Sequence, residues 1–407
     1  MRVCYFGTYR ANYSRNQIMI EGLRRNGVEV VECHEQLWRG VEDRVRAASG
    51  GWRRPTFLWR LLITYVRLFV RYWGVGDHDV LVVGYPGHLD LFLARLLSWL
   101  RRKPLVWDVF MSIYLIARER KLDQRSRLTV RMIRWLEWLA CRLPDLLVLD
   151  TADYAAWFQA THGVSATRFH LVPTGADDRV FNIPSDSSAE AGEEDGVFRL
   201  VYYGTFIPNH GVEHIVEAAR LLGDDSGIQF ELIGRGPEKG KVVALAQRHK
   251  LSNVSFVDWL DREELVKRVS KADACLGVFG VTPQSMMTIQ NKIYEGMAMG
   301  KPVITGDSPT VRQQLTHGEH AYLCRRADPV DLARAVRTLR NDGALQRRLA
   351  RQGYHRFRAS FGLGPVGERF RAHLAELLAV EPLERGAERQ VAASRSSQVP
   401  AEEEEIV

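Results

Sequence analysis

Short apolar runs typical of buried strands alternate with helical segments along most of the chain. In the first half these runs are RVCYFG, VEVVEC, DVLVVG, PLVWDVF, DLLVLD and FHLVP. In the second half they are FRLVYYG, QFELIG, VSFVDW, ACLGVF, PVITG and AYLCR. Strands that alternate with helices form parallel sheets covered by helices, because parallel neighbours need a crossover connection. The sequence therefore predicts an α/β fold with two doubly wound, Rossmann-like domains.

A polar, acidic stretch, NIPSDSSAEAGEEDG, separates the two series of strands. It has no apolar periodicity, which is typical of a linker. We predict an N-terminal domain over 1–182, a linker over 183–196 and a C-terminal domain over 197–364. A helix expected at about 365–381 has apolar residues at helical spacing, which would let it pack back on the N-terminal domain. The tail from 384 to 407 has few apolar residues, so we expect it to be disordered.

The composition is that of a globular protein with a basic N-terminal half. Hydrophobic residues make up 46% of the 407 residues, and the net charge is +7. Residues 1–180 hold 27 Lys and Arg against 18 Asp and Glu, so the excess lies in this half. A basic surface suits nucleic acid, anionic lipid or phosphorylated small molecules, and charge alone does not choose among them.

The cysteines and the start of the chain favour a cytoplasmic protein. An odd number of cysteines without a CxxC pair argues against both a disulfide framework and a zinc site. The opening MRVCYFG lacks the basic lead-in and the cleavage site of a secretory signal. The five cysteines are Cys4, Cys33, Cys141, Cys275 and Cys324.

Glycine-containing loops follow three of the expected strands, at Gly7, at Gly204–Thr205 and at Gly234–Arg235. Glycine lets backbone amides approach a phosphate closely, and the helix that follows adds partial positive charge. Each loop is equally compatible with an ordinary tight turn between a strand and a helix. None of them matches GxGxxG or the Walker pattern, so a nicotinamide or ATP site has no motif in its support.

The stretch TIQNKIYEGMAMGKPVITG is the most specific signal in the chain. If a helix starts between Ile289 and Asn291, its first amides, at Gln290 and Asn291, and the Lys292 ammonium can meet a diphosphate. Glu295 then lies about one turn further along the same face, where a carboxylate can accept both hydroxyls of a ribose. The alternative is a solvated surface glutamate. The apolar YEGMAMG context favours the binding role, because such a helix must be mostly buried.

These residues resemble the donor-binding segment of the group 1 (family 4) glycosyltransferases. The similarity extends to VYYGTFIPNHGVEHIVEAA, ELIGRGPE and LVPTGADDRVF, and it covers nearly the whole chain. It implies the GT-B fold, in which two Rossmann-like domains face each other across a cleft, and a retaining transfer of a sugar from a nucleotide-diphospho-sugar. Glu295 corresponds to the second glutamate of the family's E-x7-E element, the ribose contact. No cofactor is implied, and no paired acidic run demands a metal.

The chain departs from the family pattern at three positions. Met287 stands eight residues before Glu295, where the family usually has its first glutamate near the donor sugar. Thr205 and His210 stand where the family has an arginine and a lysine. His210 can still donate to a phosphate, and Arg235 or Lys292 can supply positive charge. These departures put the identity of the donor sugar in doubt more than the type of reaction.

Asp108 is the candidate catalytic residue of the N-terminal domain, and His210 is the candidate in the C-terminal domain. Family members often carry a histidine after the third or fourth strand, and here Phe110 stands at about that place. Asp108, two residues earlier, either positions an acceptor hydroxyl or balances the positive charge that develops on the sugar. It is equally suited to cap the helix that follows.

Three segments interleave arginine with large apolar residues: 52–73, 92–103 and 127–142. Their charges are too frequent for a spanning helix. Residues 52–73 suit an interfacial helix on an anionic membrane, whereas for the other two we favour ordinary packing on the protein's own sheet. Together with the resemblance, this predicts a cytoplasmic transferase that uses a glycan or lipid-linked acceptor and no nucleic acid. The interfacial helix at 52–73 would place it at the inner face of the membrane. A nucleotide-sugar epimerase and a non-catalytic nucleotide-sugar-binding protein are the alternatives.

Overall fold

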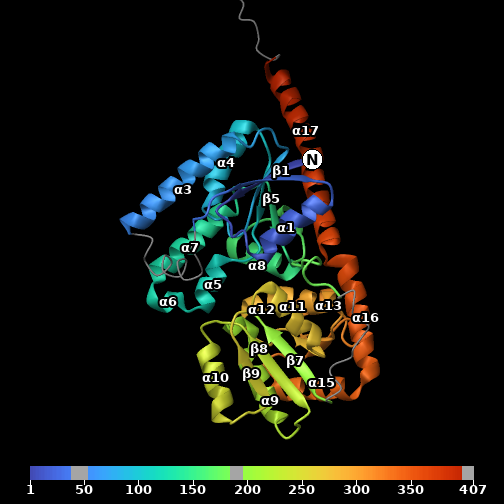
Figure 1. Cartoon of the computed structure of the whole chain (residues 1–407). Helices are drawn as coiled ribbons and strands as arrows, with labels where there is room; N and C mark the ends of the chain where they lie inside the picture. Colours follow the sequence, from blue (N-terminus) through green and yellow to red (C-terminus); the bar gives the residue numbers. More distant parts are fainter. Residues whose placement is uncertain (38–53, 184–195, 397–407) are drawn as a thin grey trace, which may run out of the picture.

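A computed structural model describes residues 1–37, 54–183 and 196–396, and it contains two parallel sheets (Figure 1). The N-terminal sheet has the order β2-β1-β3-β4-β5-β6, and all of its strand pairs are parallel. Its strands are β1 (Arg2–Gly7), β2 (Glu29–His34), β3 (Val80–Val83), β4 (Leu105–Asp108), β5 (Leu146–Leu149) and β6 (Phe169–Leu171).

The C-terminal sheet repeats this plan with the order β12-β11-β10-β7-β8-β9, again parallel throughout. Its strands are β7 (Phe198–Tyr203), β8 (Ile228–Ile233), β9 (Val254–Val257), β10 (Ala274–Leu276), β11 (Val303–Gly306) and β12 (Tyr322–Cys324). The predicted fold of two doubly wound domains is confirmed. Most of the predicted linker, 184–195, lies outside the described residues.

Helices cover both faces of the N-terminal sheet. One face carries α1 (Ser14–Arg25) and α17 (Leu363–Ser396), and the other carries α3 (Pro55–Trp73), α4 (Asp90–Arg101), α7 (Arg127–Ala140) and α8 (Ala152–His162). Successive strand residues point to opposite faces, so each strand feeds two cores. In β3, Leu81 and Val83 pack with the α3–α8 layer, whereas Val80 and Val82 pack with α1 and α17.

The C-terminal sheet is also covered on both faces. On one side lie α9 (Val212–Leu221), α10 (Lys239–Arg248) and α15 (Pro329–Asn341). On the other lie α11 (Arg262–Lys271), α13 (Asn291–Ala298) and α14 (Pro309–Gln314), while α16 (Gly343–Ser360) contributes to both cores. In the described part of the chain, no helix has the length and apolarity to cross a membrane.

The last helix leaves the C-terminal domain and returns to the first. α17 packs along α1, where two glycines let the backbones touch: a Cβ on Gly367 would lie 1.9 Å from the Gly22 carbonyl oxygen. α17 continues to Ser396, past residue 384, from which the sequence predicts a disordered tail. The segment contains Ala, Glu, Arg and Gln, which have high helix propensity. Residues 397–407 lie outside the described residues.

The glycine contact generates a matched pair of variants on one helix. Gly367→Ala should destabilise the protein by about 1–3 kcal/mol or more, because the new methyl group forces α17 away from α1. Gly364→Ala, one turn away, meets no atom closer than Arg25 Nε at 3.9 Å and should be neutral or slightly stabilising. Urea denaturation measures both. Equal effects of the two substitutions would contradict the close crossing.

Candidate functional site

Two loops at the carboxyl ends of β7 and β8 form the floor of the candidate site. Gly204 has φ +139°, and a Cβ on Gly234 would lie 2.0 Å from the Gly204 carbonyl oxygen. A Cβ on Gly236 would lie 2.4 Å from the carbonyl oxygen of Phe206. The loops therefore pack backbone against backbone, which only glycine permits at these positions.

The N-terminus of α13 opens next to these loops, and no side chain caps it. Gln290 is the N-cap residue in an extended conformation, and its Nε2 donates to Thr288 Oγ1. Its Oε1 is buried without a hydrogen-bond partner. Asn291 instead uses its Nδ2 to reach the Gly175 carbonyl oxygen, 3.1 Å away. The first amides of α13 are thus left without a side-chain cap, as an anion site requires.

Lys292 lies buried against the Gly204 loop, with 6% of its surface exposed. Its Nζ lies 3.2 Å from His210 Nδ1 and 4.3 Å from the centre of the Tyr202 ring. A Cβ on Gly204 would come within 2.9 Å of Nζ, so the glycine makes the room that the ammonium occupies. Burial lowers the pKa of Lys292 to about 7, against the opposing effect of Glu295.

Glu295 follows one turn later on α13 and is 9% exposed. Burial raises the pKa of its carboxyl to about 7, while a hydrogen bond from Tyr203 and the charge of Lys292 act in the opposite direction. Among the described residues, Glu295 is in no ion pair within 4 Å. A solvated surface position is thus excluded, and the carboxylate retains capacity to accept hydrogen bonds.

His210 completes the cluster from the loop after β7. Burial, and then the charge of Lys292, hold the pKa of His210 well below its usual value, so the ring is neutral at pH 7. Its Nδ1 lies 2.8 Å from the Tyr202 hydroxyl and faces the Lys292 ammonium. A neutral ring that accepts at Nδ1 carries its hydrogen on Nε2, which makes that atom a donor.

Among the other predicted donor contacts, Thr205 borders this cluster through its carbonyl oxygen, which accepts from the Tyr202 hydroxyl at 3.2 Å. Thr205 is exposed on the loop, and the Arg235 guanidinium pairs with exposed Asp258 at 3.1 Å. Gly7 lies in the other domain, with φ +128°, where a Cβ would meet Asp90 at 2.5 Å. The structure therefore brings together Gly204, His210, Lys292 and Glu295 with the N-terminus of α13.

Asp108 has a different partner from either one expected. Asp108 is fully buried. Its carboxylate accepts one hydrogen bond from Arg15 Nε and another from Arg15 Nη2, each at 2.9 Å. Nη1 of Arg15 donates to the carbonyl oxygens of Val172 and Pro173. Ser112, not Asp108, caps the next helix, α5 (Ile113–Glu119). The interpretation of Asp108 as a helix cap is wrong, because Ser112 is the cap. A role of Asp108 toward the acceptor or the donor sugar stays a prediction, beside its buried ion pair with Arg15.

Met287 ends α12 (Pro283–Met287), which makes contact with the N-terminal domain. The Met287 side chain packs against the core of that domain, and its carbonyl oxygen accepts from Thr151 Oγ1 at 2.6 Å. The backbone amide of Gln284 donates to Glu119 Oε1 at 2.8 Å. The position of the family's first glutamate is therefore an interdomain contact in this chain.

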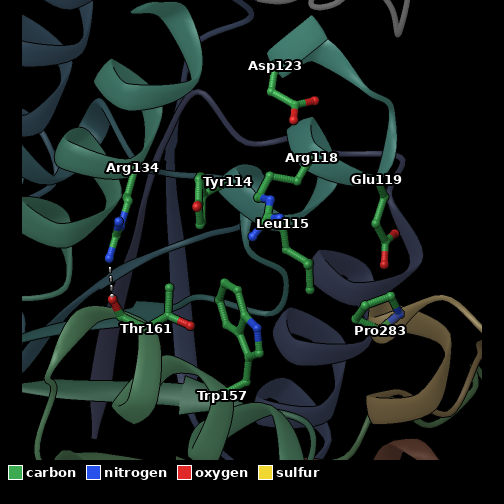
Figure 2. Close-up of a pocket in the computed structure, with 9 residues that line it drawn as sticks. All are labelled: Tyr114, Leu115, Arg118, Glu119, Asp123, Arg134, Trp157, Thr161 and Pro283. Carbon is green, nitrogen blue, oxygen red and sulfur yellow. Dashed lines mark hydrogen bonds between the residues drawn. The ribbon is translucent and has the colours of Figure 1, made fainter. Parts of the chain in front are cut away.

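A pocket of about 520 Å³ opens where α5, α7 and α8 approach α12 (Figure 2). Its walls combine two aromatic rings with two cations and two carboxylates: Tyr114, Trp157, Arg118, Arg134, Glu119 and Asp123. The Tyr114 and Trp157 rings lie 6.4 Å apart and are tilted by 33°. Pro283 from the C-terminal domain forms part of the rim.

Sequence reasoning missed Tyr202, Tyr203 and Arg15. The two tyrosines stand in the run LVYYG, which reads as an ordinary core strand. The Tyr202 hydroxyl lies next to His210, and the Tyr203 hydroxyl lies next to Glu295. These positions indicate a role at the site only once the loop geometry is known. Arg15 lies 93 positions before Asp108, so no local pattern links the two residues.

Two Rossmann-like domains that meet at the carboxyl ends of their strands define the GT-B fold. Sucrose-phosphate synthase from Thermosynechococcus elongatus shares this fold with a TM-score of 0.69 and 16% identity, over 93% of this chain and 99% of that chain. HepE from Anabaena, solved with UDP-glucose, gives a TM-score of 0.64 at 15% identity, over 93% and 100% of the two chains. Residues 197–342 match the family of Glycosyl transferases group 1, so the chain contains a group 1 glycosyltransferase domain.

Relatives of known activity match over parts of their length. The glycogen synthase of Mycobacterium tuberculosis is 26% identical over 41% of this chain, which spans 39% of that enzyme. The alpha-D-kanosaminyltransferase of Streptomyces kanamyceticus is 24% identical over 68% of this chain and 72% of its own length. These similarities support glycosyl transfer as the class of activity.

Removal of one charge from the Arg15–Asp108 pair should be costly. Asp108→Asn leaves a buried guanidinium without a counter-charge, so we expect a loss of about 3–5 kcal/mol in the free energy of unfolding. The exposed pair of Arg235 and Asp258 offers a control: Asp258→Asn should leave the stability close to that of the parent protein. Chemical denaturation measures both. Near-parent stability of Asp108→Asn would contradict the structural role.

Proposed function

We propose that this protein is a retaining glycosyltransferase that moves a sugar from a nucleotide-diphospho-sugar to an acceptor hydroxyl. The observation that carries the proposal is the buried pair of Lys292 and Glu295, with half-buried His210, at an uncapped helix N-terminus beside the Gly204 loop. Buried groups whose pKa values are shifted by desolvation, rather than by a full set of hydrogen-bond partners, are candidates for functional sites. The family of residues 197–342, and HepE with its UDP-glucose, support the same kind of donor.

Each residue of the cluster has a distinct part in donor binding. The amides of Gln290 and Asn291, the Lys292 ammonium and Nε2–H of His210 hold the diphosphate. The Glu295 carboxylate accepts the two hydroxyls of the ribose. Arg235, now paired with Asp258, reaches the donor only if it exchanges that partner.

Transfer needs stabilisation of the departing diphosphate more than a general base. The bond between the anomeric carbon and the diphosphate oxygen breaks as the acceptor oxygen bonds to the same face of that carbon. The leaving phosphate accepts the acceptor's proton, so atoms and charge balance without a protein base. Positive groups already in place lower the energy of this transition state. Because no paired acidic DxD run lies at the end of a described strand, where a metal could bridge to the diphosphate, we propose metal-independent transfer.

We assign the acceptor to the pocket of Figure 2. Aromatic rings offer apolar faces to sugar rings, while Arg118, Arg134 and Glu119 offer hydrogen-bonding groups to hydroxyls. Glu119 also accepts the Gln284 amide, so the pocket wall is tied to the helix that carries Met287. A glycan or lipid-linked acceptor fits this mixture of aromatic and charged groups.

The layer formed by α3, α4 and α7 supports a lipid-linked acceptor. All three helices bury one side in the same core and expose large apolar residues on the other. The sequence pattern favours ordinary packing for 92–103 and 127–142, but the exposed tryptophans of these segments include them in the membrane proposal. Exposed arginines Arg67, Arg102 and Arg131 accompany them and suit anionic headgroups. The apolar set is Leu58, Trp59, Leu62, Val66, Val70, Trp73, Phe92, Leu96, Trp99, Leu100, Leu128, Met132, Trp135 and Trp138.

Donor binding tests the site directly. Thermal-shift screening of UDP-, GDP- and ADP-sugars selects the donor, since a ligand at a hundred times its Kd stabilises by about 2.7 kcal/mol. Glu295→Gln should then weaken binding of that donor by about 2–4 kcal/mol, because two charge-assisted hydrogen bonds to ribose are lost. Glu263→Gln, on an exposed helix of the same domain, serves as the control. Unchanged affinity of the Glu295 variant by calorimetry would refute the assignment, and products formed without acceptor would indicate the epimerase instead.

The two pKa values near 7 predict protons exchanged on donor binding. In the bound state Lys292 is charged and Glu295 ionised, so the pair holds one proton. Above pH 7 the free pair of Lys292 and Glu295 holds less than one proton, so donor binding takes up protons. Below pH 7 the free pair holds more than one proton, so donor binding releases protons. Calorimetry in buffers of different ionisation enthalpy measures this exchange. Lys292→Met should abolish the uptake above pH 7, and uptake that persists there would assign it to another group.

Membrane contact is tested with tryptophans of matched exposure. Trp59, Trp99 and Trp135 are 64%, 66% and 62% exposed on the three helices, and Trp259 in the other domain is 61% exposed. The triple substitution of the first three by Ser should reduce sedimentation with phosphatidylglycerol vesicles by about tenfold or more, because each ring contributes to interfacial binding. Trp259→Ser should leave sedimentation unchanged. Equal sedimentation of both variants would argue against this surface.

A further inference from the structure

Two histidines from distant parts of the chain meet on the outer side of the N-terminal domain. Phe169 and Leu171 of β6 pack toward α8, so the alternation of the strand turns His170 toward α17. His373 comes from α17, one position before the buried Leu374. The Nδ1 atoms of the two rings lie 3.2 Å apart. Glu376, one helical turn beyond His373, has a carboxylate oxygen 4.0 Å from His373 Nδ1.

The tautomer of His373 is fixed by its second nitrogen. Nε2 lies 3.3 Å from the Leu171 carbonyl oxygen, which only accepts hydrogen bonds, so Nε2 carries the hydrogen. The lone pair of Nδ1 therefore points toward His170. A backbone carbonyl that orients a histidine in this way is a common support for metal-binding imidazoles.

We propose that His170, His373 and Glu376 bind one divalent transition metal ion, with Zn²⁺ as the best match. Two nitrogen ligands at 2.0–2.1 Å in a tetrahedral shell stand about 3.3 Å apart, close to the observed separation of the Nδ1 atoms. The three ligand atoms lie within 4.8 Å of one another, and Glu376 is exposed enough to turn toward the ion. Two histidines and one carboxylate leave positions for water.

The ion would fasten α17 to the edge of the sheet. β6 is the last strand of the N-terminal sheet, and α17 reaches it from the other domain after α16. Metal binding would therefore hold the returning helix in place at a second point beyond the Gly22–Gly367 crossing. This role is structural and is independent of the proposed transfer reaction.

Titration of the full chain, freed of metal with EDTA and then dialysed, tests the site. We expect one Zn²⁺ per chain by calorimetry, visible absorption on Co²⁺ addition, and a rise in Tm of several degrees with Zn²⁺. His373→Ala and His170→Ala should each weaken binding by more than about tenfold, since loss of even a supporting partner costs that much. Glu376→Gln should weaken it less, and His355→Ala on α16 should have no effect.

Stability in EDTA distinguishes the metal site from a simple pair of hydrogen-bonded imidazoles. A metal site predicts that Zn²⁺ raises the Tm of the parent and that this rise is lost in the histidine variants. A mere hydrogen bond predicts variants with a lower Tm in EDTA and a parent that Zn²⁺ does not stabilise. That result, or Zn²⁺ binding that survives both histidine substitutions, would overturn the proposal.

Discussion

The burial of two charged side chains on α13 is the constraint around which the C-terminal domain is arranged. Glu137 in the other domain shows how a carboxylate is buried for stability. It accepts from His88, His162, Ser112 and the Ile113 amide, and these hydrogen bonds lower its pKa to about 2. Glu295 has no such set of donors, and burial raises its pKa to about 7. A carboxylate kept buried with unused acceptor capacity destabilises the fold unless a ligand supplies the donors. The contrast between the two glutamates is the physical ground for a binding site at α13.

Contacts near the site and a helix crossing away from it hold the two domains together. Several polar contacts cross the boundary, including Thr151 with the Met287 carbonyl and the backbone amide of Gln284 with Glu119. The Met287 side chain also packs against the N-terminal core. A second apolar contact, the packing of α17 on α1, lies away from α13. The helix crossing therefore joins the two domains independently of the contacts at α13.

Local patterns were enough to predict the strands, the start of α13 and the position of Glu295 on its face. These predictions rest on the alternation of apolar and polar residues and on helix signals that act within about ten residues. Contacts between distant residues escaped prediction: Asp108 was assigned a role in the cleft because Arg15 is remote in sequence. The exposed faces of α4 and α7 also escaped, since an amphipathic pattern does not tell whether a second layer covers the outer face. For the tail, low hydrophobicity predicts disorder, whereas helix propensity favours the extension of α17 to Ser396.

The departures from the family pattern make sense as a change in how positive charge is supplied. The family places an arginine and a lysine on the loop after the first strand of this domain, and here Thr205 and neutral His210 take those places. In the proposed donor site Lys292 takes the cationic role, and burial lowers its pKa to about 7. An arriving diphosphate restores the charge, since an anion within hydrogen-bond distance favours the protonated amine. The cation thus becomes fully charged when the donor is present, and the Tyr202 ring and Gly204 keep it in position until then.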